Sequence, residues 1–273
     1  MNTKTTEFFY QNKYIIIGFS SLALAIGIII SLLLPVSFRS AATLFPSSQN
    51  DSSVSSTNTT LSSFLNVANP AGTKLNKNFS ILNSEDFIYS YLFSSGFIDE
   101  LYEIKKNDDG EYKYKPNKNQ AAKKFKTRFQ SVYDVEKNVV KFYLISSSPT
   151  KAADYLNQLI YLLNKEIIDR EVVSAKKNID YLLTYSQPVN TKANLELNQS
   201  IASLLTYETK KIMLAETNPY YAFEIIDSPS IPSDKYKPNR TFIVLTFGLI
   251  GFLIALIFLI FQNKEIRRKI IDL

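Results

Sequence analysis

Residues 225–240 read IIDSPSIPSDKYKPNR, and the 23 residues that follow them, TFIVLTFGLIGFLIALIFLIFQN, carry no charge. Proline fixes its own φ angle and biases the preceding residue towards extended conformations. Pro229, Pro232 and Pro238 therefore prevent this stretch from continuing as a helix or lying in the centre of a sheet. We expect residues 228–240 to form a stiff, extended connector, with Arg240 as the last residue before a membrane span.

A second uncharged stretch of 25 residues lies near the N-terminus, between Lys13 and Arg39. Both stretches exceed the ~20 apolar residues that a helix needs to cross the hydrocarbon of a bilayer. A cleaved signal peptide is the alternative for the first, but its apolar part is long and no Ala-x-Ala site ends it. We therefore predict transmembrane helices at residues 14–36 and 241–261.

Basic residues near the two spans favour one orientation. The two tails hold six of them: Lys4, Lys13, Lys264, Arg267, Arg268 and Lys269. The flanks of the loop between the spans hold four: Arg39, Lys235, Lys237 and Arg240. Since positive charge favours the cytoplasmic side, tails 1–13 and 262–273 are predicted to be cytoplasmic. Residues 37–240 then form one exported domain, long enough to bury its own core.

The pattern of this domain indicates a mixed α/β (α+β) fold. Strands are predicted at 37–46, in a hairpin over 132–147 and at 223–227, while residues 47–63 contain eleven Ser or Thr and predict a mobile loop. Helical periodicity begins at residue 80, with Ser84 as a cap and Gly96 between two short helices.

A long helical pattern covers residues 150–187, with Ser148 as its cap and Pro149 at its first position. Its apolar stripe steps by four, three and four residues, through Leu156, Ile160, Leu163 and Ile167. A second helix is predicted at 193–216, with the stripe Leu197, Ile201, Leu204 and Ile212. The stripe of the first helix thins beyond Ile167, so either the two helices pack on each other or neighbouring subunits cover them.

Composition argues against catalysis. The chain has no Cys and no His, which excludes thiolate nucleophiles, imidazole bases and Cys/His zinc sites, and it has no Gly-x-x-x-x-Gly-Lys phosphate loop. Three pairs of carboxylates are adjacent in sequence and so point in different directions: Glu85 and Asp86, Asp99 and Glu100, Asp108 and Asp109. We predict no enzyme, no catalytic, cofactor-binding or metal-binding residue, and no cofactor. The net charge of +6 is spread out, so no nucleic-acid partner is predicted.

Glycines in both predicted spans allow close approach of the two helices. These are Gly18 and Gly27 in the first span and Gly248 and Gly251 in the second, although neither pair has the spacing of the Gly-x-x-x-Gly motif. We predict transmembrane packing at Gly248 and Gly251.

Four stretches, in this order, resemble the polysaccharide co-polymerases, the chain-length determinant (Wzz-type) family of bacterial inner membranes. They are LPVSFRSAATLFP at 34–46, ILNSEDFIYSYLFSSGFIDEL at 81–101, VVKFYLISSSPTKAADYLNQLIYLLN at 139–164 and YYAFEIIDSPSIPSDKYKPNR at 220–240. One departure is that Lys235 and Tyr236 stand where the family commonly has another proline.

The resemblance implies a two-pass inner-membrane protein with a periplasmic α/β domain, a long helix projecting from it, and a ring of several copies. It implies a role in lipopolysaccharide biosynthesis, setting the length to which a polymerase extends a lipid-linked glycan, with O-antigen as the expected glycan. Its partners would be copies of itself, the polymerase, the lipid-linked glycan and membrane lipids. Two alternatives stay open: an export component for capsule or exopolysaccharide that works with a separate tyrosine kinase, and a two-span membrane sensor.

Overall fold

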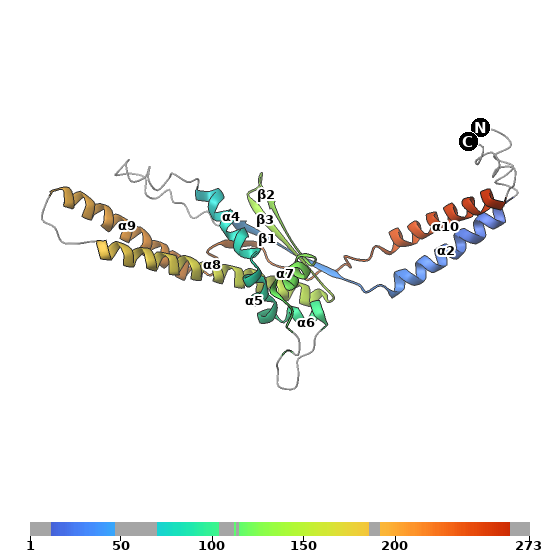
Figure 1. Ribbon diagram of the computed structural model, residues 1–273, viewed down its shortest axis with the longest axis horizontal. Helices are drawn as coiled ribbons and strands as arrows, with labels where there is room; N and C mark the ends of the chain where they lie inside the picture. The colour runs from blue at the N-terminus through green and yellow to red at the C-terminus, as the bar shows by residue number, and fades with distance from the viewer. Residues whose placement is uncertain (1–11, 47–69, 104–111, 113–114, 186–191, 263–273) are drawn as a thin grey trace. The chain divides into compact units, whose positions relative to one another are not determined.

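The computed structural model describes residues 12–46, 70–103, 112, 115–185 and 192–262 (Figure 1). The predicted loop at 47–63 and most of both predicted tails lie outside these residues. The chain divides into two compact units, Met1–Phe38 with Ser233–Leu273, and Arg39–Pro232.

The first unit is a pair of helices, α2 (Lys13–Leu33) and α10 (Arg240–Gln262), packed side by side (Figure 1). Both are long and apolar enough to cross a membrane, and most of their side chains are exposed away from the shared face. The first helix ends three residues before the predicted boundary at 36. Pro35 explains this difference, because the residue before a proline is driven out of the helical region, and Leu34 is extended.

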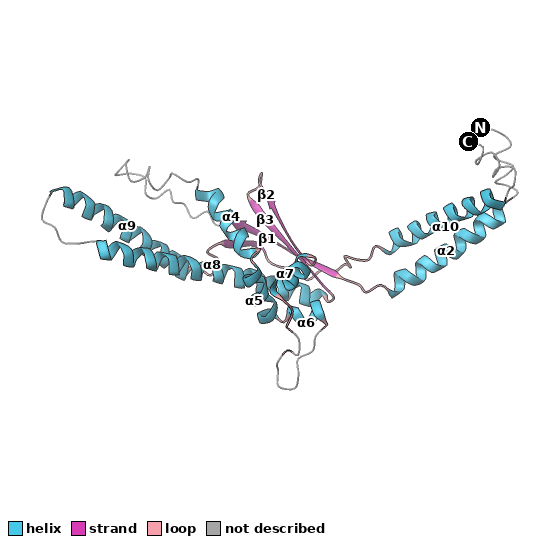
Figure 2. Ribbon diagram, viewed as in Figure 1, coloured by secondary structure: helices cyan, strands magenta, loops and turns pink. Residues whose placement is uncertain are grey.

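The second unit contains a four-stranded sheet in the order β2-β3-β1-β4 (Figure 2). Its strands are β1 (Phe38–Pro46), β2 (Phe129–Asp134), β3 (Val139–Ser146) and β4 (Phe223–Asp227). The predicted hairpin is confirmed, since β2 and β3 pair antiparallel. The last strand pairs antiparallel with β1, although the two are far apart in sequence.

Strict alternation in β1 and β3 gives the sheet one buried face. Of the neighbouring alanines Ala41 and Ala42, the second is buried and the first is half-buried. In β4, Phe223 is buried, whereas Ile226 is 52% exposed. The buried side chains of this face are Ser40, Ala42, Leu44, Pro46, Val140, Phe142, Leu144 and Ser146.

Four short helices complete the core: α4 (Pro70–Leu82), α5 (Glu85–Ser95), α6 (Phe97–Tyr102) and α7 (Lys118–Lys126). Both local predictions are confirmed here. The Ser84 hydroxyl accepts a hydrogen bond from the Phe87 N–H at 3.2 Å, and Gly96 lies between α5 and α6 with φ of 72°. Glycine tolerates this left-handed conformation because it has no Cβ.

The long helix α8 (Pro149–Tyr185) has 37 residues and pairs with α9 (Lys192–Thr217) (Figure 2). Its predicted stripe from Leu156 to Ile167 is buried in the core. As predicted, Ser148 directly precedes Pro149, the first residue of α8, and its carbonyl accepts a hydrogen bond from the Ala152 N–H at 3.0 Å, while its hydroxyl lies 3.0 Å from that of Thr150. In α9, Ile201 is buried as predicted, but Leu197 is 55% exposed and does not belong to the stripe.

Candidate functional site

Residues 228–239 of the proline connector belong to no helix and to no strand of the sheet. Pro229, Pro232 and Pro238 are all half-buried, whereas most residues between them are exposed. Ser230 is tied to β1 at two points: its N–H donates to the Ala41 carbonyl at 3.4 Å, and its carbonyl accepts from the buried Ser40 hydroxyl at 2.8 Å. The start of the connector is therefore fixed to the strand, not free in solvent.

A second attachment lies in the helical unit, close to where α10 begins. The Ser37 N–H donates to the Lys237 carbonyl at 2.9 Å, and the Ser37 carbonyl accepts from the Tyr236 N–H at 2.8 Å. The Lys237–Pro238 peptide bond is cis. The two hydrogen bonds of Ser37 hold the segment that follows α2 beside the segment that precedes α10.

Asn239 caps α10. Its side-chain oxygen accepts a hydrogen bond from the Phe242 N–H at 3.2 Å, and its carbonyl accepts from the Ile243 N–H at 3.1 Å. Arg240 is the first residue of the helix and its side chain is exposed. The structure thus makes Asn239 the residue that starts the helix, while a role for Arg240 stays a prediction.

The packing of α2 against α10 is closest at two glycines. A Cβ atom on Gly251 would collide with the Cβ of Ala23 and lie 3.0 Å from the Phe19 carbonyl oxygen, and one on Gly27 would lie 2.7 Å from the Cβ of Phe247. Gly248 faces only the flexible end of the Leu24 side chain, at 2.9 Å. A side chain is therefore excluded more strictly at Gly251 than at Gly248.

A repeat of small residues at four-residue spacing, which the glycines alone do not reveal, underlies this contact. On α2 it consists of Ala23, Gly27 and Ser31, and on α10 of Gly251 and Ala255; all are buried except Ala23, which is half-buried. Small residues at this spacing let two helix backbones approach closely within a membrane. Counting Ala and Ser together with Gly would have found the pattern.

In the α/β unit, Asn164 is a fully buried polar residue in the middle of α8. Its Nδ2 donates to the carbonyls of Ile160 and Phe223 at 3.1 and 3.2 Å, and its Oδ1 accepts from the N–H groups of Ala222 and Phe223 at 3.0 and 2.9 Å. The amide thus joins α8 to the first residues of β4, the strand that leads into the connector.

Glu171, also on α8, links three helices. Its carboxylate pairs with Lys77 of α4 at 2.6 Å and with Lys211 of α9 at 2.7 Å. Burial alone would raise the pKa of Glu171, but the hydrogen bonds and positive charges of Lys211 and Lys77 outweigh it and hold the pKa below its ordinary value. The ionised carboxylate is therefore the form that fastens the α8–α9 pair to α4.

Two of the adjacent carboxylate pairs lie within the described residues. Residues of both pairs form hydrogen bonds that hold neighbouring elements together. Asp86 pairs with Lys118 at 2.5 Å, while Glu85 accepts from the Asn119 amide at 2.7 Å. Glu100 accepts from the Ser147 N–H at 2.6 Å and from the Ser146 hydroxyl, just before α8 begins. The pair Asp108 and Asp109 lies outside the described residues.

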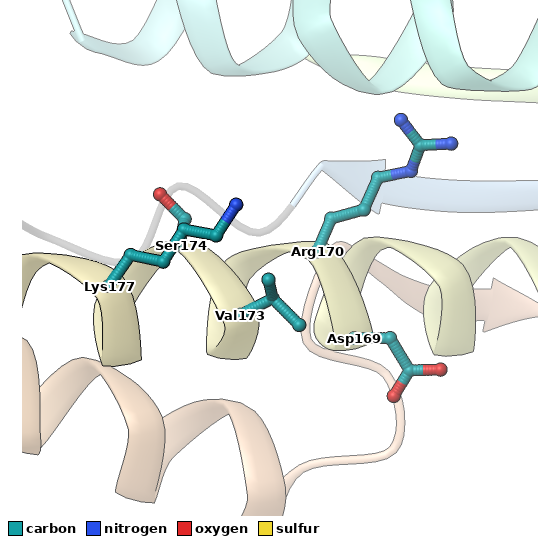
Figure 3. A pocket seen from close by; sticks show the side chains of 5 residues that line it. All are labelled: Asp169, Arg170, Val173, Ser174 and Lys177. Carbon is teal, nitrogen blue, oxygen red and sulfur yellow. The ribbon is translucent and has the colours of Figure 1, made fainter.

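One open pocket lies on the outer surface of α8. All five residues that line it come from this helix: Asp169, Arg170, Val173, Ser174 and Lys177. Figure 3 shows Arg170 and Lys177 on one side of the helix, with Asp169 turned away from them. Arg170 already pairs with Glu166 at 2.7 Å. A depression lined by a single helix brings together no set of groups suited to a reaction.

No protein-family model and no curated protein matches the chain. Among solved structures, one described as a full-length bacterial polysaccharide co-polymerase has 12% sequence identity and a TM-score of 0.42, covering 94% of this chain and 96% of its own. A second, described as a fragment of WzzB, a polysaccharide co-polymerase from Salmonella Typhimurium, has 10% identity and a TM-score of 0.28, covering 74% and 100%. Both descriptions name the family that the sequence resembles.

Proposed function

We propose that this chain is a polysaccharide co-polymerase: a two-pass protein of the bacterial inner membrane that sets the length of a lipid-linked glycan, foremost the O-antigen of lipopolysaccharide. Its central domain is periplasmic, and it acts as a ring of copies beside a separate polymerase, without catalysing a reaction itself. The proposal starts from the four sequence stretches that resemble this family, taken in their order along the chain.

The observation that carries the proposal furthest is that two paired candidate membrane spans border one α/β unit in the chain. One continuous α/β unit lies between two candidate membrane spans, and the chain both enters and leaves it through hydrogen-bonded extended segments, at Ser37 with Lys237 and at Ala41 with Ser230. A scaffold that orders a polymerase relative to a membrane requires a domain inserted between two paired spans more than it requires reactive groups.

Exposed apolar side chains on the α8–α9 hairpin support assembly into a ring. Seven large ones are between 53 and 63% exposed: Tyr161, Val173, Tyr181, Leu183, Leu195, Leu197 and Met213. The two helices do pack on each other, yet they leave these side chains uncovered. Neighbouring copies would bury them, which is favourable at roughly 25 cal/mol per Å² of apolar surface.

The length distribution of surface polysaccharide tests the proposal. It is read as a gel ladder from cells with and without the gene. We expect the preferred length to disappear while polymer is still made. Complete loss of polymer would support the alternative, an export component that works with a kinase, and an unchanged ladder would support the two-span sensor.

A further inference from the structure

The exported end of α10 carries a concentration of positive charge that the proposed function does not use. Lys235, Lys237 and Arg240 lie within six residues, all are exposed, and the only carboxylate among residues 233–240 is Asp234. Within the part of the chain that the structure describes, none of these three cations forms an ion pair. Their position is unusual, because basic residues next to a span favour the cytoplasmic side.

The local backbone arranges these charges towards solvent. Exposure alternates along the segment, with Lys235 and Lys237 exposed and Tyr236 and Pro238 half-buried, as expected of an extended chain. The Lys237 ammonium lies 5.3 Å from the centre of the Tyr236 ring. The hydrogen bonds of Ser37 to Lys237 and Tyr236 fix the backbone at this point.

Arg240 adds a second electrostatic observation. It is the first residue of α10, where the helix dipole is positive and favours anions over cations. The first turn of this 23-residue helix contains no acidic residue. Three cations and a positive helix end therefore lie within six residues of the chain, with Asp234 as the one carboxylate beside them, where the chain would meet lipid headgroups.

We propose that Lys235, Lys237 and Arg240 bind the phosphate group of an anionic lipid at the membrane surface where α10 begins. A phosphate accepts hydrogen bonds from ammonium and guanidinium groups and is favoured by a helix N-terminus. The inference rests on α10 spanning a membrane and not on control of glycan length. An unchanged polysaccharide ladder together with intact lipid binding would therefore contradict the proposed function alone.

Native mass spectrometry of the full chain in detergent measures this binding directly. The protein is titrated with phosphatidylglycerol and with phosphatidylethanolamine, which has no net charge. We expect tighter binding of phosphatidylglycerol, and a loss of about fivefold in its affinity for each charge removed in the triple variant K235Q/K237Q/R240Q.

The matched control is K126Q/K137Q/K176Q, which removes three exposed lysines from the α/β unit. Its affinity for phosphatidylglycerol should equal that of the unaltered chain. Equal binding by the K235Q/K237Q/R240Q variant and the unaltered chain would overturn the inference, as would an equal loss in the control. Circular dichroism of each variant checks that the helices are retained.

Two further titrations identify the source of the phosphate. Tighter binding of a polyprenyl pyrophosphate than of phosphatidylglycerol, lost in the K235Q/K237Q/R240Q variant, would assign the site to the lipid that carries the glycan. Comparable affinities would assign it to bulk phospholipid. Displacement of both lipids by inorganic pyrophosphate at equal concentration would show that the site recognises free phosphate, and would overturn the inference of a lipid site.

Discussion

Asn164 holds the backbone of Phe223 on both sides: its Nδ2 donates to the Phe223 carbonyl and its Oδ1 accepts from the Phe223 N–H. All of these atoms are buried, so water cannot replace the amide if it is removed. The strand that leads into the connector is therefore attached to the middle of the longest helix by one side chain.

Replacing Asn164 with Ala should lower the free energy of unfolding by about 3 kcal/mol, because buried N–H and C=O groups of Phe223 would lose their partner. Scanning calorimetry of the detergent-solubilised chain measures this loss. The control is Asn178→Ala, which removes an exposed amide bonded to Glu208 and should cost less than about 0.5 kcal/mol. Equal effects of the two substitutions would show that Asn164 is not the attachment point.

Replacing Glu171 with Gln should weaken the attachment of α8 to α4 and α9 by about 1–2 kcal/mol, allowing for the partial exposure of its lysine partners. The pKa of Glu171 is lower in the folded protein than its ordinary value of 4.5. The contribution of Glu171 to the free energy of unfolding is therefore complete above pH 4.5, and it is lost as the pH falls through the lower pKa of the folded protein.

Comparing the melting temperatures of the unaltered chain and E171Q between pH 7 and pH 3 tests this direction of the pH dependence. The difference between them should be constant at neutral pH and should shrink in acid. A difference that grows as the pH falls would contradict the arrangement around Glu171.

Replacing Gly251 with Leu should separate α2 from α10, because the added side chain would collide with Ala23 and the backbone at Phe19. Overpacking of this kind costs about 1–3 kcal/mol. Gly18→Leu is the matched control, since a Cβ at Gly18 meets nothing within 4 Å.

Because the chain has no cysteine, cross-linking of one introduced pair of cysteines can report whether α2 and α10 are paired. Phe19 and Phe258 have ring centres 5.3 Å apart, so F19C and F258C should be joined by a short bis-maleimide. The yield should fall in the Gly251→Leu background and persist in the Gly18→Leu background. The same yield in both would argue against a close contact at Gly251.

Replacing Pro229, Pro232 and Pro238 with Ala should shift the preferred glycan length while leaving the amount of protein unchanged. Each substitution increases the conformational freedom of the connector, which the prolines restrict. The control is Pro219→Ala, an exposed proline in the turn before β4. A ladder that does not respond to the triple substitution would show that the connector has no part in length control.

Much of the fold could be predicted because its signals are local. The stripe of α8, the glycine between α5 and α6 and the hairpin of β2 and β3 depend on residues that are neighbours in sequence. Proline rules likewise predicted that the connector forms neither a helix nor a central strand, and residues 228–239 belong to neither. Its hydrogen bonds to β1 join residues about 190 positions apart, and no local pattern indicates them.

The remaining differences have tertiary causes. Leu197 fits the helical stripe of α9, yet it is exposed, because periodicity gives the face of a helix but not how far its partner extends. Asn164 and Glu171 have the sequence context of ordinary polar residues on an amphipathic helix, and the packing of β4, α4 and α9 around α8 gives them their partners on other elements. Their importance follows from burial, which sequence spacing does not reveal.

The bonded pair of Ser37 and Lys237 also makes the α/β unit an insertion within a helical hairpin. The chain leaves one helix and rejoins the other at a single place, so the two ends of the insert already lie together. Replacing residues 38–236 with a short turn would carry only a small entropy cost of loop closure and should leave α2 and α10 paired. The same junction would allow domains to be exchanged on one membrane anchor, which makes it the natural point for building chimaeras.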